Sequence, residues 1–118
     1  MTDLVACLSS NEKIWPFIEK LVNEQDWKKV FLVTSEFGKN NFKCKKEIDF
    51  IVIDTGKPVS ELVESVRKNL NGKITDLEVA LNLVSGSGKE HMAILSALLK
   101  LGVGIRLMAV TKEGVMEL

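Results

Sequence analysis

The stretch Glu78–Leu101, EVALNLVSGSGKEHMAILSALLKL, decides the fold of this 118-residue chain. Its first part is apolar and strand-forming, and after Gly88 the apolar residues change to helical spacing. We expect one helix face to carry Met92, Leu95, Leu98 and Leu99. The change of period places a tight turn at Ser85–Lys89, so the stretch predicts a buried strand that runs through this turn into an amphipathic helix.

The predicted turn carries groups that suit an anion. Ser87 is a good N-cap, and Glu90 three positions later could close a capping box. Gly86 and Gly88 can adopt positive φ and have no Cβ, so a ligand could approach the main chain closely. The helix start presents free N–H groups and the positive end of the dipole, and Lys89 adds a full charge. The turn therefore predicts a phosphate site.

The remaining elements follow from apolar runs and helical spacing. We expect a loop over Ser9–Lys13, followed by a helix with Pro16 in its first turn. A second helix is expected over residues 58–70, with Pro58 at its N1 position. The segment 36–47 has room for a short helix at most. A hairpin turn at Lys112-Glu113-Gly114 leads into the last strand. The expected strands are 4–8, 29–34, 48–54, 79–84, 104–111 and 115–118.

Strands that alternate with helices predict an α/β fold, a Rossmann-like doubly wound sheet in one domain over residues 1–118. We expect a mostly parallel sheet of order 3-2-1-4-5 with a C-terminal hairpin strand, in a three-layer α/β/α arrangement. In that order the switch point lies between the first and fourth strands, and ligands bind beyond their carboxyl ends. Ser9, Ser10 and Asn11 follow the first strand, so we expect them beside the Ser85–Lys89 turn.

Composition excludes several classes of function. Sixteen basic and sixteen acidic residues cancel, so no global field holds long nucleic acid or an anionic membrane. No apolar run is long enough to span a bilayer and the start lacks the basic region of a signal peptide, so we expect a cytoplasmic protein. Cys7, Cys44 and the single His support neither a disulfide framework nor a metal site, and no cofactor is implied. Two interpretations stay open for Lys39, Lys43, Lys45 and Lys46, a solvated loop or an anion-contacting patch.

Two common nucleotide motifs are absent from the turn. A Walker A loop needs Ser or Thr after Gly-Lys and Gly five positions before its last Gly, but Glu90 and Leu83 stand there. A dinucleotide fingerprint would need Gly where His91 stands. The turn is therefore neither an NTPase loop nor a typical nicotinamide site.

The residues Asn82-Leu83-Val84-Ser85-Gly86-Ser87-Gly88-Lys89-Glu90-His91-Met92 resemble the signature of CRISPR-associated Rossmann-fold (CARF) domains. In that family a strand ends in N-x-T-G-G-T-K-x-M-like residues and runs into a helix. The first strand, the number of strands and the closing hairpin agree in outline over essentially the whole chain. This sequence departs from the pattern with Ser85 where Thr is usual and with the small residues Gly-Ser-Gly, which could alter the ligand or weaken its binding.

The resemblance implies a homodimer that binds a cyclic oligoadenylate made during type III CRISPR immunity. It implies that Lys89 and the amides after Ser87 hold phosphates, and that Ser10 and Asn11 contact a ribose or phosphate across the crevice. Met92 packs beneath the turn or contacts a base. The implied ligand-binding set is Ser9, Ser10, Asn11, Gly86, Ser87, Gly88, Lys89 and Met92.

Three functions of different class stay open. The first is a module that binds the ring, and the second is a metal-independent ring nuclease with Lys89, Ser10 and His91 as candidate catalytic residues. In the nuclease, Lys89 would stabilise negative charge, Ser10 would orient the 2′-hydroxyl and His91 would act as acid or base. The alternative for His91 is a surface or capping role. The third is a Rossmann-like scaffold subunit without activity. Trp15 and Trp27, which bracket the first helix, are expected in the core or in a dimer contact.

Overall fold

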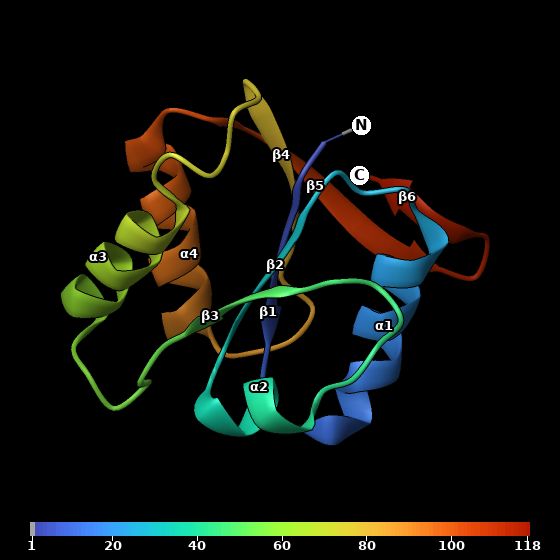
Figure 1. Ribbon diagram of the computed structural model, residues 1–118, viewed down its shortest axis with the longest axis horizontal. Helices are drawn as coiled ribbons and strands as arrows, with labels where there is room; N and C mark the ends of the chain where they lie inside the picture. The colour runs from blue at the N-terminus through green and yellow to red at the C-terminus, as the bar shows by residue number, and fades with distance from the viewer. Residues whose placement is uncertain (1) are drawn as a thin grey trace.

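The computed structural model describes residues 2–118 and contains one six-stranded sheet of order β3-β2-β1-β4-β5-β6 (Figure 1). All neighbours are parallel except β5 and β6, which form an antiparallel hairpin. The α/β class and the strand order expected from the sequence are confirmed. The strands are β1 Leu4–Leu8, β2 Val30–Thr34, β3 Asp49–Val52, β4 Glu78–Asn82, β5 Gly104–Thr111 and β6 Gly114–Glu117.

Strand β1 lies at the centre of the sheet because both of its neighbours are parallel strands. Leu4 pairs with Val30 of β2 on one side and with Ala80 of β4 on the other. Every residue of β1 is buried, as expected of a strand covered on both faces. The switch point of the sheet therefore lies between β1 and β4.

Helices cover both faces of the sheet (Figure 1). Helices α3 (Val59–Leu70) and α4 (Gly88–Leu101) pack against the face that carries Val5 and Cys7. Helix α1 (Trp15–Glu24) covers the opposite face, which carries Leu4, Ala6 and Leu8. Alternate residues of one strand thus enter two separate cores, which explains the continuous apolar sequence LVACL.

Several element boundaries differ from the sequence prediction. Part of the loop predicted at Ser9–Lys13 is a 3-10 turn, η1 (Glu12–Ile14). Pro58 is the N-cap of α3 rather than its first helical residue, since its ψ of 149° is extended. Strand β3 is shorter than 48–54, and the region after β2 forms the six-residue helix α2 (Glu36–Asn41). These differences shift the ends of elements and leave the topology unchanged.

The buried face of α4 was predicted correctly for Leu98, which is buried, and for Leu95, which packs against the core, but wrongly for Met92 and Leu99. Met92 and Leu99 are each 64% exposed, whereas Ala93, Ile94, Ala97 and Leu98 are buried. The physical reason is that two small residues of α4, Ala93 and Ala97, face the core, and their short side chains allow the helix to pack closely against α3. The larger side chains of Met92 and Leu99 are left on the outer face.

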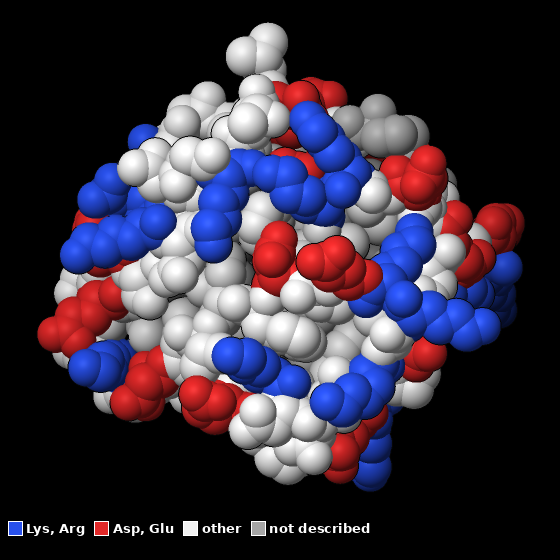
Figure 2. All heavy atoms as spheres, in the orientation of Figure 1, with Lys and Arg blue, Asp and Glu red and all other residues white. Residues whose placement is uncertain are grey.

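Surface charges of both signs are mixed across the face shown in Figure 2, as the balanced composition predicted. Within the Lys-rich segment, Lys39, Lys43 and Lys45 are exposed, and the Lys46 amine donates to the backbone carbonyl of Gln25. Across residues 2–118 no helix is long and apolar enough to cross a membrane.

Candidate functional site

Ser85 joins the two loops that the sequence singled out at the switch point. The backbone N–H of Ser9 donates to Ser85 Oγ at 2.8 Å, and the Ser85 hydroxyl lies 3.0 Å from Ser9 Oγ. Ser85 is buried and Ser9 is half-buried, so these contacts are partly shielded from water. The loop after β1 (Ser9–Asn11) and the turn after β4 (Ser85–Lys89) therefore lie side by side at the switch point, where α/β sheets bind ligands, and we refer to this pair of loops as the crevice.

Gly86 gives the turn its sharp bend, with φ of +100°. A Cβ atom at this position would come within 2.5 Å of Cys7 Sγ, so the turn lies directly on the buried end of β1. Gly88 differs from the expectation, since its φ is not positive and nothing lies within 4 Å of where its Cβ would be. Only the first glycine is required by the geometry of the turn.

The capping box predicted for α4 is present. The Glu90 carboxylate accepts hydrogen bonds from the Ser87 backbone N–H at 3.0 Å and from the Ser87 hydroxyl at 2.9 Å. Its other oxygen accepts from Cys7 Sγ at 3.4 Å. Burial, and then the charge of Glu90, raise the pKa of the Cys7 thiol, which therefore stays protonated and acts as a donor.

Two candidate side chains of the crevice reach toward neighbouring loops. The Lys89 amine donates to the backbone carbonyl of Thr55 at 2.8 Å, and the Ser10 hydroxyl lies 3.4 Å from Ser35 Oγ. Thr55 lies beyond β3 and Ser35 directly follows β2. Both side chains are exposed, as is Asn11, whose Oδ1 accepts from the Lys13 N–H at 3.2 Å.

His91 and Met92 occupy different environments. His91 Nε2 lies 2.7 Å from the Ser85 carbonyl oxygen, so the ring connects the first turn of α4 to the turn before it. Because a carbonyl oxygen can only accept, Nε2 carries the proton in this hydrogen bond. Met92 does not pack beneath the turn as one interpretation of the sequence had it, because its side chain is 64% exposed. The second interpretation of Met92, that it contacts a base of the ligand, stays a prediction.

Buried polar groups hold the strands that end at the crevice. Asn82 Nδ2 donates to the Met108 carbonyl at 2.8 Å, and Thr34 Oγ1 donates to the Leu8 carbonyl at 2.8 Å. Trp15 Nε1 donates to the Ser9 carbonyl at 2.7 Å while its ring packs into the α1 core. Trp27 also packs there, which agrees with the core interpretation of both tryptophans.

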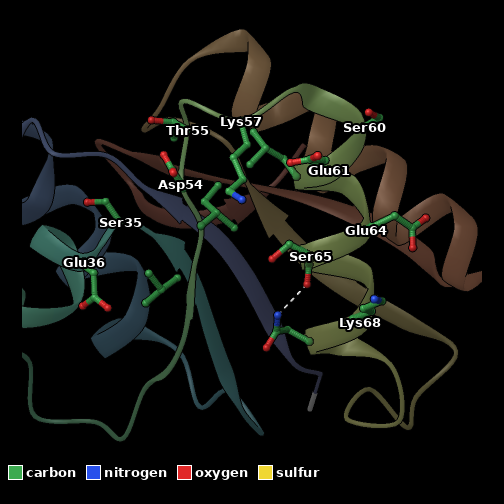
Figure 3. Close-up of a pocket in the computed structure, with 14 residues that line it drawn as sticks. Ser35, Glu36, Asp54, Thr55, Lys57, Ser60, Glu61, Glu64, Ser65 and Lys68 are labelled. Atoms are coloured by element: carbon green, nitrogen blue, oxygen red, sulfur yellow. Dashed lines mark hydrogen bonds between the residues drawn. The ribbon is translucent and has the colours of Figure 1, made fainter.

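A large hollow lies beside the crevice rather than in it. This groove of about 1050 Å³ runs between the end of β3 and the outer side of α3, and Figure 3 shows Asp54, Lys57 and Glu61 around its upper part. Ser35 and Thr55 line it and also contact Ser10 and Lys89, so the groove adjoins the crevice. The charged side chains of this groove have mixed signs and are mostly exposed. The crevice, whose two loops are joined by hydrogen bonds at Ser85, is therefore the better ordered candidate for a ligand site.

The sequence reasoning missed the partners supplied by other strands. Ser35 and Thr55 follow β2 and β3, and the rule that parallel strands end at one edge could have indicated both. Cys7 was assigned only to an apolar run, and no sequence signal showed its contact with Glu90. No group of three or more His, Cys, Asp or Glu side chains within residues 2–118 is arranged to hold a metal ion.

Comparisons with known proteins add little to this geometry. No family model matches the chain. No curated protein matches it either. Among solved structures, the FMN-dependent cysteine decarboxylase TvaF from thioviridamide biosynthesis aligns over 89% of each chain with 11% identity and a TM-score of 0.34, a likeness too low to carry an argument.

Proposed function

We propose that this protein binds a cyclic oligoadenylate of type III CRISPR immunity in the crevice between β1 and β4, as a homodimer. The observation that carries the proposal is the junction at Ser85, with the Ser9 N–H at 2.8 Å from its Oγ. This junction holds Ser9 against the turn that precedes α4, and Ser10 and Asn11 follow Ser9 in the same loop. Polar groups on two chain segments thus converge at the switch point, where α/β sheets bind ligands.

The start of α4 supports a phosphate contact in this proposal. Among residues 2–118, no side chain or backbone carbonyl accepts a hydrogen bond from the N–H groups of Gly88 and Lys89. Nothing lies within 4 Å of where a Gly88 side chain would stand, so a phosphate oxygen can reach these amides. The Lys89 amine would exchange the Thr55 carbonyl for the phosphate, since a charged acceptor is the stronger partner.

An apolar hollow next to the crevice supports the homodimer. It has a volume of about 300 Å³ and is lined mainly by Ile14, Phe17, Val84, Ala109 and Val110. Phe17 is 49% exposed and Val84 55% exposed, and Val84 directly precedes the turn. We assign this surface to the twofold partner, because a symmetric ring then meets the same crevice twice.

Ring cleavage is a narrower form of the proposal. It would rest on Ser10 and Lys89, whose polar ends are exposed, and would need His91 to leave the Ser85 carbonyl. Attack of a 2′-hydroxyl on the adjacent phosphate breaks the bond to the 5′-oxygen and leaves a 2′,3′-cyclic phosphate. The protein would position the groups and stabilise charge without a metal.

The test is a titration of purified protein with cyclic tetra-adenylate and cyclic hexa-adenylate in a metal chelator, with calorimetry and chromatography of the products. We expect saturable binding of one ring per two chains. Lys89→Ala should weaken it at least about tenfold, because one charge-assisted contact contributes roughly 1.5–3 kcal/mol. The matched control is Lys100→Ala in the last turn of the same helix, which should bind like the wild type.

Each outcome distinguishes one hypothesis. Linear products with a 2′,3′-cyclic phosphate would identify a ring nuclease, and binding without products would identify a sensor or a sink. Failure of both rings to bind the wild-type protein would reject the proposal and favour the scaffold hypothesis. Equal binding by Lys89→Ala and the wild type would reject the phosphate contact at α4.

A further inference from the structure

We propose that Asp3 and Asp76 share one proton, which joins the start of β1 to the loop before β4 and is released as the pH rises. Within residues 2–118, three buried side-chain oxygens have no hydrogen-bond partner, and all three belong to these carboxyl groups: Asp3 Oδ1, Asp3 Oδ2 and Asp76 Oδ2. Both residues lie at the amino-terminal edge of the sheet, at the end opposite to the crevice. This carboxyl pair is therefore independent of the proposed function.

The two side chains face the same buried space from different elements. Asp3 is 0% exposed, and its backbone carbonyl accepts from the Ala80 N–H at 2.9 Å, which fixes the start of β1 against β4. Asp76 is half-buried in the loop 71–77. Its Oδ1 lies 3.5 Å from the Lys28 amine, while its Oδ2 is buried. One oxygen of Asp76 thus faces the lysine at the surface, and the other faces the interior.

Nearby cations do not supply the missing partner of Asp3. Each of them makes its hydrogen bond with another acceptor, namely Lys28 with Thr75 Oγ1 at 3.2 Å, Lys29 with the Lys73 carbonyl, and Arg106 with Glu117 Oε1 at 3.0 Å. Burial raises the pKa of the Asp3 carboxyl group, Lys29 and Lys28 oppose this shift, and the charge of Asp76 adds to it. The folded protein therefore favours the protonated form of Asp3.

A single proton gives the buried oxygens a hydrogen bond. Protonated Asp3 has an O–H donor, and the ionised Asp76 carboxylate is an acceptor. The proton belongs on Asp3, because Asp3 is fully buried and Asp76 keeps its ion pair with Lys28. When the proton leaves, two like charges face each other in the same space. The pair is thus closed below the raised pKa of Asp3 and opens as the pH rises through it.

The first experiment measures urea stability between pH 4 and 8 for the wild type, Asp76→Asn and Glu78→Gln. In the wild type we expect stability to fall as the pH rises. Asp76→Asn removes one charge of the pair and offers an amide donor to ionised Asp3, so the fall should shrink to less than about half. Glu78→Gln is the control, because it removes an exposed charge two residues away and should leave the fall unchanged.

Hydrogen exchange then locates the opening. The reporters are the amides of Leu4 and Ala80, which donate to the carbonyls of Lys29 and Asp3 at this edge of the sheet. Their protection factors should fall at least about tenfold between pH 4 and pH 8, which is the effect of losing one charge-assisted hydrogen bond. The Phe42 amide, at the end of α2, is the control and should keep its protection.

The wild-type fall retained in full by Asp76→Asn would overturn the proposal, because Asp3 would then be an isolated buried acid. An equal loss of protection at Phe42 would overturn the local opening. If Asp76→Asn does not fold, the carbon-13 shifts of the two carboxyl carbons in the wild type decide. A shared proton requires both carbons to respond at the same midpoint. A response of the Asp3 carbon alone would overturn the proposal.

Discussion

The sulfur of Cys7 lies 2.5 Å from the point where a side chain at Gly86 would place its Cβ atom. The tightest contact of the turn is thus made with the buried end of the central strand. The turn owes its shape to this packing as well as to the backbone conformation of Gly86, whose φ is +100°. This relationship makes the two glycines of the turn unequal.

We expect Gly86→Ala to lower the free energy of unfolding by about 2–5 kcal/mol. The change adds left-handed backbone strain of roughly 1–2 kcal/mol and overpacking of roughly 1–3 kcal/mol. Urea denaturation measures the effect, and Gly88→Ala is the control, expected within about 0.5 kcal/mol of the wild type because its position is open. In a Cys7→Ala background the cost of Gly86→Ala should fall, because only the backbone strain and the looser contacts with His91 Nε2 at 3.3 Å and Glu90 Oε2 at 3.4 Å remain. An unchanged cost there would contradict the role of the Cys7 contact.

Ser85→Ala should lower the free energy of unfolding by about 1–3 kcal/mol, because the half-buried Ser9 N–H loses the buried Ser85 hydroxyl as its acceptor. The same change should weaken ring binding, since the two walls of the crevice lose their junction. Ser10→Ala is the matched control for stability, and we expect less than about 0.5 kcal/mol because Ser10 is exposed. Chemical denaturation measures the free energy of unfolding of the Ser85→Ala and Ser10→Ala variants. Similar values for both variants would show that Ser85 does not join the loops.

Val84→Glu should convert the proposed homodimer into a monomer, because it places a charge in the apolar hollow that we assign to the partner. Light scattering coupled to size-exclusion chromatography gives the mass directly. Leu77→Glu is the control, since Leu77 is 92% exposed and lies before β4, at the opposite end of the sheet. A wild-type mass of one chain would reject the dimer, and a dimeric Val84→Glu variant would place its interface elsewhere.

Asp3 makes stability depend on pH. Its carboxylate is buried without a well-formed hydrogen bond, and burial raises its pKa although Lys29 and Lys28 oppose the shift and Asp76 adds to it. The folded state therefore holds this proton at pH values where the unfolded chain has released it. Stability should accordingly fall as the pH rises from about 4 through the raised pKa.

Asp3→Asn should remove this part of the pH dependence and leave the protein more stable than the wild type at pH 7. The measurement is the urea midpoint at pH values between 4 and 8, with exposed Asp26→Asn as the control. A wild-type curve that rises with pH over this range, with no change in Asp3→Asn, would contradict the prediction.

Sequence periodicity predicted the fold well where strands and helices were strongly apolar. Strand β1 and helix α3 follow from uninterrupted patterns, and the strand order follows from right-handed crossovers. The buried face of α4 was misjudged at Met92 and Leu99, because Ala93 and Ala97 contribute little to a hydrophobic pattern and yet enter the core beside Leu98. Helix packing distance depends on tertiary structure and is not visible in one helix alone.

The candidate site was predictable as a place but not as a set of contacts. The rule for parallel strands placed Ser9–Asn11 beside the turn after β4, and the Ser85 junction agrees with that. The hydrogen-bond partners of Lys89, His91 and Cys7 depend on side-chain torsions and, for Lys89, on the path of the loop between β3 and α3. A single sequence determines neither. Their contacts with Thr55, Ser85 and Glu90 needed coordinates.

The strand order also has a consequence for synthesis on the ribosome. The wholly apolar strand β1 is made first, but one of its two neighbours in the sheet is β4, which ends at Asn82. One edge of the nascent sheet stays open until that residue has left the exit tunnel, and an open apolar edge is a template for aggregation. The central position of β1 thus leaves one of its two edges without a partner strand until β4 has been made.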